Sequence, residues 1–233
     1  MEKVFPIWHY LIIPKTAQIY ILFRQKNQTE GYMRILVVSD TENEFIWDHF
    51  DETRFKDIEL IISCGDLKSQ YLSFLTTMIM APLFYVHGNH DTGYAEEPPE
   101  GCDTIEDNLV TYKGLRIVGL GGSIKYNDHP CYSVPPLQYT EKQMAKRIRK
   151  LKLKLHFSKG FDILVTHATA HGIGDAADCC HTGFNCFIPF IEKYNPRYMI
   201  HGHMHMHYGR GPRTVTYNQT SIIDAYGYYI LDI

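Results

Sequence analysis

Five short apolar segments of this chain are each followed, within a few residues, by an aspartate, an asparagine or a histidine. These residue types supply carboxylate, amide and imidazole groups, which bind metal ions. The candidate ligands are Asp40, Asp66, Asn89, His167, His203 and His205. If the apolar segments are strands of an open α/β sheet, their carboxyl ends line one crevice. The sequence therefore predicts that these residues, distant along the chain, meet in a single metal centre.

The chemistry of the candidate ligands indicates which ions they would hold. Mixed carboxylate, amide and imidazole ligands suit borderline divalent ions, and we predict Mn, with Fe, Zn and Co as alternatives. The absence of a thiolate among them disfavours a structural zinc site. An aspartate that can bridge suggests two ions about 3.5–4 Å apart, an arrangement that clamps a phosphoryl group and holds a hydroxide in line with it.

Each candidate residue also has a simpler interpretation when it is taken alone. Asp40 or Asp66 could cap the helix that follows it. His167 could be a hydrogen-bonded core histidine, and the histidine-rich run 201–207 could be a solvated loop. These separate explanations would all have to hold at once, at five strand ends, to replace the single explanation of a metal centre.

Apolar runs of strand length alternate with segments of helical periodicity along the chain. Strands are predicted over Ile35–Ser39, Ile58–Ser63, Leu83–His87, Leu115–Leu120, Ile163–Thr166 and Tyr198–His201. Helices are predicted over Phe45–Phe55, Leu67–Met80, Leu137–Leu155 and Cys186–Tyr194. This alternation indicates an α/β core. The tail from Arg213 to Ile233 predicts further strands and more than one sheet, and Gly93–Asp107 is predicted to be an exposed loop.

The 233 residues, of which 45% are apolar and 21% charged, are typical of one globular domain. We predict a single domain over residues 33–233, because Met33 directly precedes the first buried strand. Residues 1–32 form an N-terminal extension of uncertain role. It could be an added edge strand, a partner-binding arm or an extension from an upstream start codon.

Charge, hydropathy and cysteine usage limit the surroundings of the protein. The net charge of −3 excludes recruitment of nucleic acid by global charge. No clean apolar run is long enough to span a bilayer, so we predict no membrane partner. The six cysteines include no C-x-x-C pair, which predicts reduced thiols and a cytoplasmic location. The oligomeric state is left open.

At the candidate ligands the chain resembles the calcineurin-like metallophosphoesterases. That family shows five ordered blocks: D-x-H, G-D, G-N-H-D or G-N-H-E, a single H, and G-H-x-H. This chain carries Asp40-Thr41-Glu42, Gly65-Asp66, Gly88-Asn89-His90-Asp91, His167 and Gly202-His203-Met204-His205. The resemblance extends from Met33 to the C-terminus, and the closing segment Ala225–Tyr228 looks like that of small prokaryotic members.

The resemblance implies a four-layer α/β/β/α sandwich and hydrolysis of phosphate mono- or diesters by a metal-bound hydroxide at a dinuclear site. It implies a role for each residue of the blocks. Asp66 would bridge the two ions, Asp40 and His205 would hold the first, and Asn89, His167 and His203 the second. The catalytic residues would be His90, which donates to the phosphate or protonates the leaving oxygen, and Asp91, which orients His90.

The first block departs from the family pattern, because Glu42 stands where the family has histidine. Glu42 could bind the first ion and give that site a harder, more anionic character. It could instead be an acidic residue near the start of the next helix, favoured there by the helix dipole. Both interpretations remain open at this point.

Other classes of function and other features also stay open. The chain could be a non-catalytic metal- and phosphate-binding module, or a regulatory protein that docks through residues 1–32. The presence of His90 and Asp91 favours an enzyme with a phosphate-ester substrate.

The basic segment 142–154 could attract a nucleotide or nucleic acid, or be a solvated helix face. The loop 171–181 could lie over the site or be plain surface, and Tyr94 and Tyr126 could stack on a base or pack.

Overall fold

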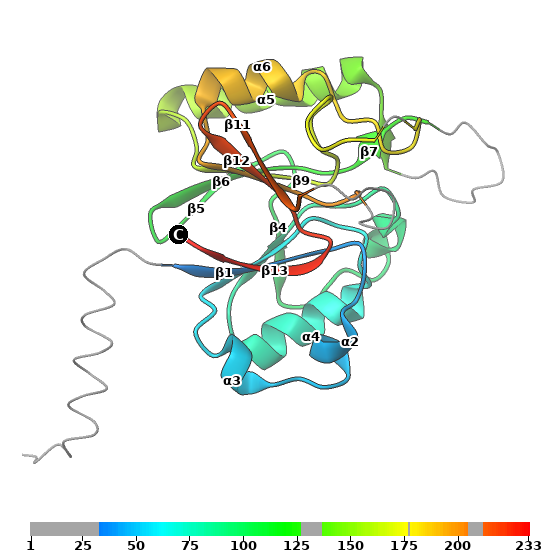
Figure 1. The fold of residues 1–233 in the computed structure, drawn as a ribbon, viewed down its shortest axis with the longest axis vertical. Helices are drawn as coiled ribbons and strands as arrows, with labels where there is room; N and C mark the ends of the chain where they lie inside the picture. Colours follow the sequence, from blue (N-terminus) through cyan, green and yellow to red (C-terminus); the bar gives the residue numbers. More distant parts are fainter. Residues whose placement is uncertain (1–32, 127–136, 177, 205–211) are drawn as a thin grey trace, which may run out of the picture.

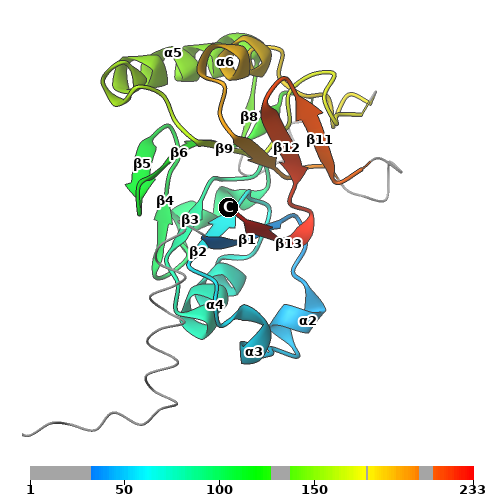
Figure 2. The ribbon, with the colours of Figure 1, turned by 60° about the vertical axis from the view of Figure 1, so that its left-hand side comes forward.

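Two β-sheets lie face to face between two outer layers of helices (Figures 1 and 2). The computed structural model describes residues 33–126, 137–176, 178–204 and 212–233. The N-terminal extension and His205 lie outside these residues. The arrangement confirms the predicted α/β/β/α sandwich.

The first sheet has the strand order β13-β1-β2-β3-β4. Its strands are β1 (Arg34–Ser39), β2 (Leu60–Ser63), β3 (Leu83–Tyr85), β4 (Cys102–Thr104) and β13 (Gly227–Asp232). The first four are parallel, and β13 lies antiparallel beside β1. Because both faces of this sheet are covered, β1 and β2 are almost continuous apolar runs rather than alternating ones.

The second sheet has the strand order β11-β12-β10-β9-β6-β5. Its strands are β5 (Leu109–Tyr112), β6 (Leu115–Leu120), β9 (Ile163–Thr166), β10 (Tyr198–His201), β11 (Thr214–Tyr217) and β12 (Thr220–Asp224). The central four are parallel and the two edge strands are antiparallel to their neighbours. A short ribbon of β7 (Ser123–Ile124) and β8 (Gln138–Tyr139) stands apart from both sheets.

The helices form the outer layers (Figure 1). Those beside the first sheet are α2 (Glu44–Trp47), α3 (Glu52–Phe55) and α4 (Ser69–Ile79), and those beside the second are α5 (Glu141–Ser158) and α6 (Phe187–Tyr194). The apolar face predicted for α5 is confirmed, because Met144, Ile148, Leu151 and Leu155 are buried. Among the described helices, none is both long enough and apolar enough to cross a membrane.

Two expected helices and one expected loop differ from the structure, the helices because capping residues interrupt their apolar pattern. The helix expected over Phe45–Phe55 is two helices, since Asn43 caps α2 and Asp51 caps α3 with their side chains. The segment expected to begin a helix at Leu137 first forms β8, and Thr140 then starts α5 in a capping box. The prediction of an exposed loop over residues 93–107 is partly wrong, because β4 lies within this segment and pairs with β3.

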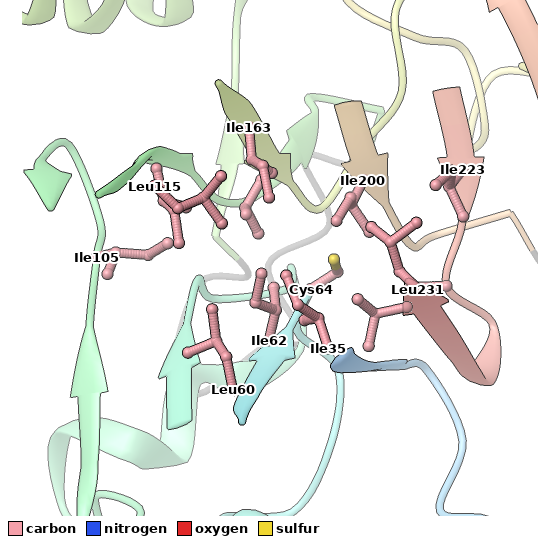
Figure 3. Close-up of a cluster of buried hydrophobic side chains, with 14 of the residues drawn as sticks. Ile35, Leu60, Ile62, Cys64, Ile105, Leu115, Ile163, Ile200, Ile223 and Leu231 are labelled. Carbon is pink, nitrogen blue, oxygen red and sulfur yellow. The ribbon is translucent and has the colours of Figure 1, made fainter. Parts of the chain in front are cut away.

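An apolar core fills the space between the sheets (Figure 3). Ile35 and Ile62 from the first sheet and Ile163 and Ile200 from the second are fully buried there. Burying each such side chain contributes about 1.5–3 kcal/mol. This contact fixes the two sheets relative to each other, and with them the loops that follow β1, β2, β3, β9 and β10.

Candidate metal centre

Three of the predicted ligands have an unusual backbone conformation at their strand ends. Asp40, directly after β1, has a φ of 65°, Asp66, after β2, has 57°, and His203, after β10, has 67°. Such left-handed conformations are uncommon for residues other than glycine and cluster at functional sites. Here they turn the chain sharply where each strand stops.

Two glycines allow these turns to approach one another closely. A side chain at Gly88 would overlap Asp66, and a side chain at Gly202 would overlap Asp40. The glycines of the G-N-H-D and G-H-x-H blocks therefore have a steric role at this site. They let loops from different strands meet.

The closest group of candidate ligands consists of Asp66, His167 and His203. One ligand atom from each lies within 4.8 Å of the others. His167 Nε2 lies 3.3 Å from Asp66 Oδ2, and the centroids of the two imidazole rings are 4.8 Å apart. Both histidines are at most 5% exposed. A half-buried carboxylate beside two buried imidazoles is a ligand set that suits a borderline divalent ion.

Backbone carbonyls fix the protonation of both imidazoles. His167 Nδ1 lies 2.8 Å from the carbonyl oxygen of Cys64, and His203 Nε2 lies 2.7 Å from that of Cys180. A carbonyl oxygen only accepts, so each of these nitrogens carries the hydrogen. The other nitrogen of each ring, Nε2 of His167 and Nδ1 of His203, is then the candidate ligand atom. Such outer contacts are typical of histidines that bind metals.

Asp40 and Asn89 join the same cluster through hydrogen bonds. The backbone N–H of His203 donates to both carboxylate oxygens of Asp40, at 3.0 and 2.9 Å. The amide oxygen of Asn89, which is fully buried, lies 2.9 Å from His167 Nε2. The structure thus brings together five of the six ligands predicted at strand ends. The sixth, His205, lies outside the described residues.

The electrostatics of the cluster favour a cation. Burial lowers the pKa of His167, but the carboxylates of Asp66 and Asp40 outweigh it and raise this pKa to about 9. Burial raises the pKa of Asp66, yet His167 and the His90 N–H bring it below its ordinary value. Burial also raises the pKa of Asp40 to about 6. In the metal-free chain a proton on His167 balances the carboxylates, and a divalent ion would compete with that proton.

His90 and Asp91 differ in exposure and in contacts. The His90 side chain is exposed, and its backbone N–H donates to Asp66 Oδ1 at 2.8 Å. Asp91 is buried, and its Oδ2 accepts the N–H of Gly88 at 2.7 Å and that of Asp66 at 2.8 Å. Burial and the charge of Asp66 raise the pKa of Asp91 to about 6. Among the described residues, the hydrogen bonds of the Asp91 carboxylate come from the backbone and not from the His90 ring.

Glu42 forms an ion pair with Lys68. Its Oε2 lies 3.0 Å from Lys68 Nζ, and its Oε1 accepts the Lys68 N–H at 3.3 Å. Glu42 is not part of the compact Asp66, His167 and His203 group. Its role as a ligand stays a prediction.

Several features beside the site differ from or extend the sequence interpretation. The loop after β9 does lie against the site, because Cys180 contacts His203 and the ring of His181 is 5.1 Å from that of His203. Tyr94 is a packing residue and no base platform, since it is buried and its hydroxyl donates to Leu67. The carbonyls of Cys64 and Cys180 carry no sequence signal, because every residue has one.

The basic segment on α5 is not a uniform solvated face. Arg147 is only 11% exposed and forms ion pairs with Glu106 and Asp107. It also donates to the carbonyl of Gly121 at 2.7 Å. Burial lowers the pKa of Arg147 to about 10. This cation therefore braces the loops near the site, and it is not available to attract a nucleic acid.

Comparison with known proteins agrees with this fold. The family model for calcineurin-like phosphoesterases matches residues 33–207. The structure of TT1561 of Thermus thermophilus is 17% identical, with a TM-score of 0.59 over 84% of this chain and 89% of that one. A candidate 5′-nucleotidase of Staphylococcus aureus is 14% identical, with a TM-score of 0.54 over 85% of this chain and 50% of that one. No curated protein gives a significant match.

The family match and the two-sheet sandwich identify a metal-dependent phosphoesterase, and the cluster of candidate ligands lies at the strand ends of that sandwich. The match covers most of the chain, and the chain belongs to the calcineurin-like phosphoesterase family.

Proposed function

We propose that this protein hydrolyses phosphate mono- or diesters at a dinuclear metal site. The first ion would be held by Asp40, His205 and, in one interpretation, Glu42. The second would be held by Asn89, His167 and His203, with Asp66 between the two. The main support is the convergence of Asp66, His167 and His203 within 4.8 Å of one another, from three separate loops.

Two divalent ions bound there would supply a water of lowered pKa and would polarise the phosphoryl oxygens. The chain's own residues would prepare the site for them. The carbonyls of Cys64 and Cys180 lie beside Nδ1 of His167 and Nε2 of His203, which would leave the other nitrogen of each ring to face an ion. The N–H of His90 holds one oxygen of Asp66, which orients the other oxygen toward His167.

His90 is the candidate for the proton-transfer role. Its ring is exposed, while its backbone is fixed to Asp66 at the edge of the cluster. A substrate phosphate next to Asp66 would therefore lie within reach of this ring. His90 would donate a hydrogen bond to a phosphate oxygen or protonate the leaving oxygen.

A screen of metals against substrates tests the proposal. The protein is stripped with chelator and then supplied with Mn, Fe, Zn, Co or Mg. The assay is run under reducing conditions, which match the proposed cytoplasmic location, because the five described cysteines are free thiols. Chromogenic phosphate monoesters and diesters and a nucleoside monophosphate serve as substrates. We expect no activity without metal and more with Mn than with Mg, since imidazole ligands suit Mn better. Full activity in excess chelator would overturn the proposal.

A second candidate function is metal and phosphate binding without turnover. The observation that favours it is the ion pair between Glu42 and Lys68, which directs Glu42 toward a lysine. If Glu42 does not reach the first ion, that site would be weak and hydrolysis would suffer. Binding of one metal and of inorganic phosphate, with no hydrolysis of any substrate in the same screen, would support this candidate over the enzyme.

A further inference from the structure

Asn89 has a hydrogen-bond partner at each end of its amide. Its Oδ1 lies 2.9 Å from His167 Nε2, and its Nδ2 donates to the hydroxyl of Tyr126 at 3.3 Å. The side chain is fully buried, so its two ends meet fixed surroundings. An amide has one acceptor end and one donor end, and only the oxygen end can bind a cation.

The backbone around Tyr126 is tied to the loop that carries Asn89. The N–H of Leu137 donates to the carbonyl of Asn89 at 3.0 Å, and the N–H of Gly122 donates to that of His87 at 2.7 Å. The N–H of Lys125, next to Tyr126, donates to the carbonyl of Tyr139 at 3.0 Å. The ribbon of β7 and β8 therefore places the Tyr126 hydroxyl beside Asn89.

We propose that Tyr126 is a positioning residue, which holds Asn89 with its oxygen toward the second metal. The inference rests on the proposed dinuclear site. Once His167 Nε2 serves as a ligand, it can no longer donate to the Asn89 oxygen. Among the described residues, the Tyr126 hydroxyl would then still accept a hydrogen bond from the NH₂ end of the amide, and this contact distinguishes that end from the oxygen end. Without it, the amide can turn and present its NH₂ group, which repels a cation.

The substitution Tyr126→Phe tests this with the loss of a single oxygen. Metal binding is measured by titrating Mn into the metal-free full chain, with calorimetry and elemental analysis as readouts. We expect the affinity for one of the two ions to fall by about 10–100-fold, the usual effect of removing an outer contact to a metal ligand. Tyr112→Phe is the matched control. Tyr112 lies on the edge strand β5, and its hydroxyl also donates one hydrogen bond, at 3.0 Å, but to the carbonyl of Glu59 and not to a candidate ligand. This variant should bind both ions as the unaltered chain does.

The same pair of measurements in an Asn89→Asp background separates positioning from a general structural effect. A carboxylate has two acceptor oxygens and no wrong end. Tyr126→Phe should therefore weaken metal binding much less in Asn89→Asp than in the unaltered chain, a coupling that a double-mutant cycle measures. An equal loss in both backgrounds would overturn the positioning role.

Two further outcomes are distinguishable. If Asn89→Ala loses one ion while Tyr126→Phe binds both ions normally, the role of Tyr126 is wrong and the metal site stands. If Asn89→Ala binds both ions normally, the proposed ligand set itself is wrong.

Discussion

The backbone N–H of Asp66 donates to the carboxylate of Asp91 at 2.8 Å. The same oxygen of Asp91 accepts the N–H of Gly88 at 2.7 Å, and the residue is 6% exposed. Asp91 thus ties the turn after β2 to the turn after β3. The two loops carry a candidate bridging ligand and a candidate ligand of the second metal, so this carboxylate sets the distance between them.

Replacing Asp91 should therefore disturb the architecture of the site as well as its chemistry. Asp91→Ala leaves two N–H groups without their acceptor, at about 1–3 kcal/mol for each buried group. We expect it to lower the free energy of unfolding by about 2–6 kcal/mol and to weaken metal binding. Asp91→Asn keeps an oxygen that can accept both N–H groups, and should lose much less. Urea unfolding of the metal-free variants measures this, and equal stability of Asp91→Ala and the unaltered chain would contradict it.

His90 and Asp66 should separate chemistry from metal binding. His90→Ala is expected to keep both metals and to lower turnover by about 10²–10⁴-fold, the usual contribution of a positioned acid–base group. Asp66→Asn should lose metal, because it removes the negative charge at the centre of the cluster. Elemental analysis and turnover per bound metal decide this. Loss of metal in His90→Ala with an unchanged rate per bound metal would show that the two roles are assigned wrongly.

The pair of Arg116 and Asp162 gives a prediction for pH. Arg116 contacts both carboxylate oxygens of Asp162, at 3.0 and 2.8 Å, and donates to the carbonyls of Ser158 and Lys159 at the end of α5. The hydrogen bonds from Arg116 to the carboxylate lower the pKa of Asp162 from its ordinary value of 3.8. Because the folded-state pKa is the lower one, the stabilisation is present above the unfolded-state pKa. It is lost as pH falls through the folded-state pKa.

Asp162→Asn should therefore lower the free energy of unfolding at neutral pH by about 1–2 kcal/mol. The difference from the unaltered chain should begin to shrink near pH 4, where Asp162 takes up a proton in the unfolded chain, and should be lost once the pH falls below the lowered folded-state pKa. Urea unfolding at several pH values measures it. Glu59→Gln, which breaks a more exposed pair with Lys113, is the control and should have a smaller effect. A pH-independent difference for Asp162→Asn would contradict the electrostatic explanation.

The strands and the positions of most candidate ligands could be predicted because their signals are carried by side chains. Buried parallel strands are apolar runs, and Asp66, Asn89, His167 and His203 follow them at the expected places. The contacts of Asp91 could not be predicted in the same way. Because Asp91 directly follows His90, the sequence suggested that its carboxylate contacts the His90 ring. In the structure, this carboxylate accepts backbone N–H groups instead, and such groups carry no sequence signal because every residue except proline has one.

The contacts that surround the candidate ligands could not be predicted from the sequence either. Arg147 lies in a run of cations that looks solvated, and only the packing of α5 against the loop of Glu106 shows that its side chain is largely covered. The carbonyl of Cys180 reaches His203 across 23 residues of chain. Such contacts depend on the relative placement of loops, which no local pattern encodes.

A chain that begins at Met33 is expected to fold and to keep its metals. Met33 is buried, and it exchanges two backbone hydrogen bonds with Ile233, at 2.7 and 3.0 Å, next to the pairing of β1 with β13. All the predicted ligands follow it in sequence. Circular dichroism, solubility and metal content of the shortened chain test the prediction. An insoluble or metal-free product would show that residues 1–32 belong to the core.

Glu42 either binds the first metal or only pairs with Lys68, and the two roles predict different metal contents. As a ligand, it would add a third carboxylate to those of Asp40 and Asp66, which stabilises the ion but reduces its polarisation of bound water. Glu42→Ala should then lower the occupancy of one metal only, and Glu42→His should restore it with an imidazole. Lys68→Met should strengthen binding of that metal, because it removes the cation 3.0 Å from the Glu42 carboxylate. Elemental analysis and Mn titration measure all three variants. Unchanged stoichiometry and affinity in Glu42→Ala and Lys68→Met would show that Glu42 serves the ion pair alone.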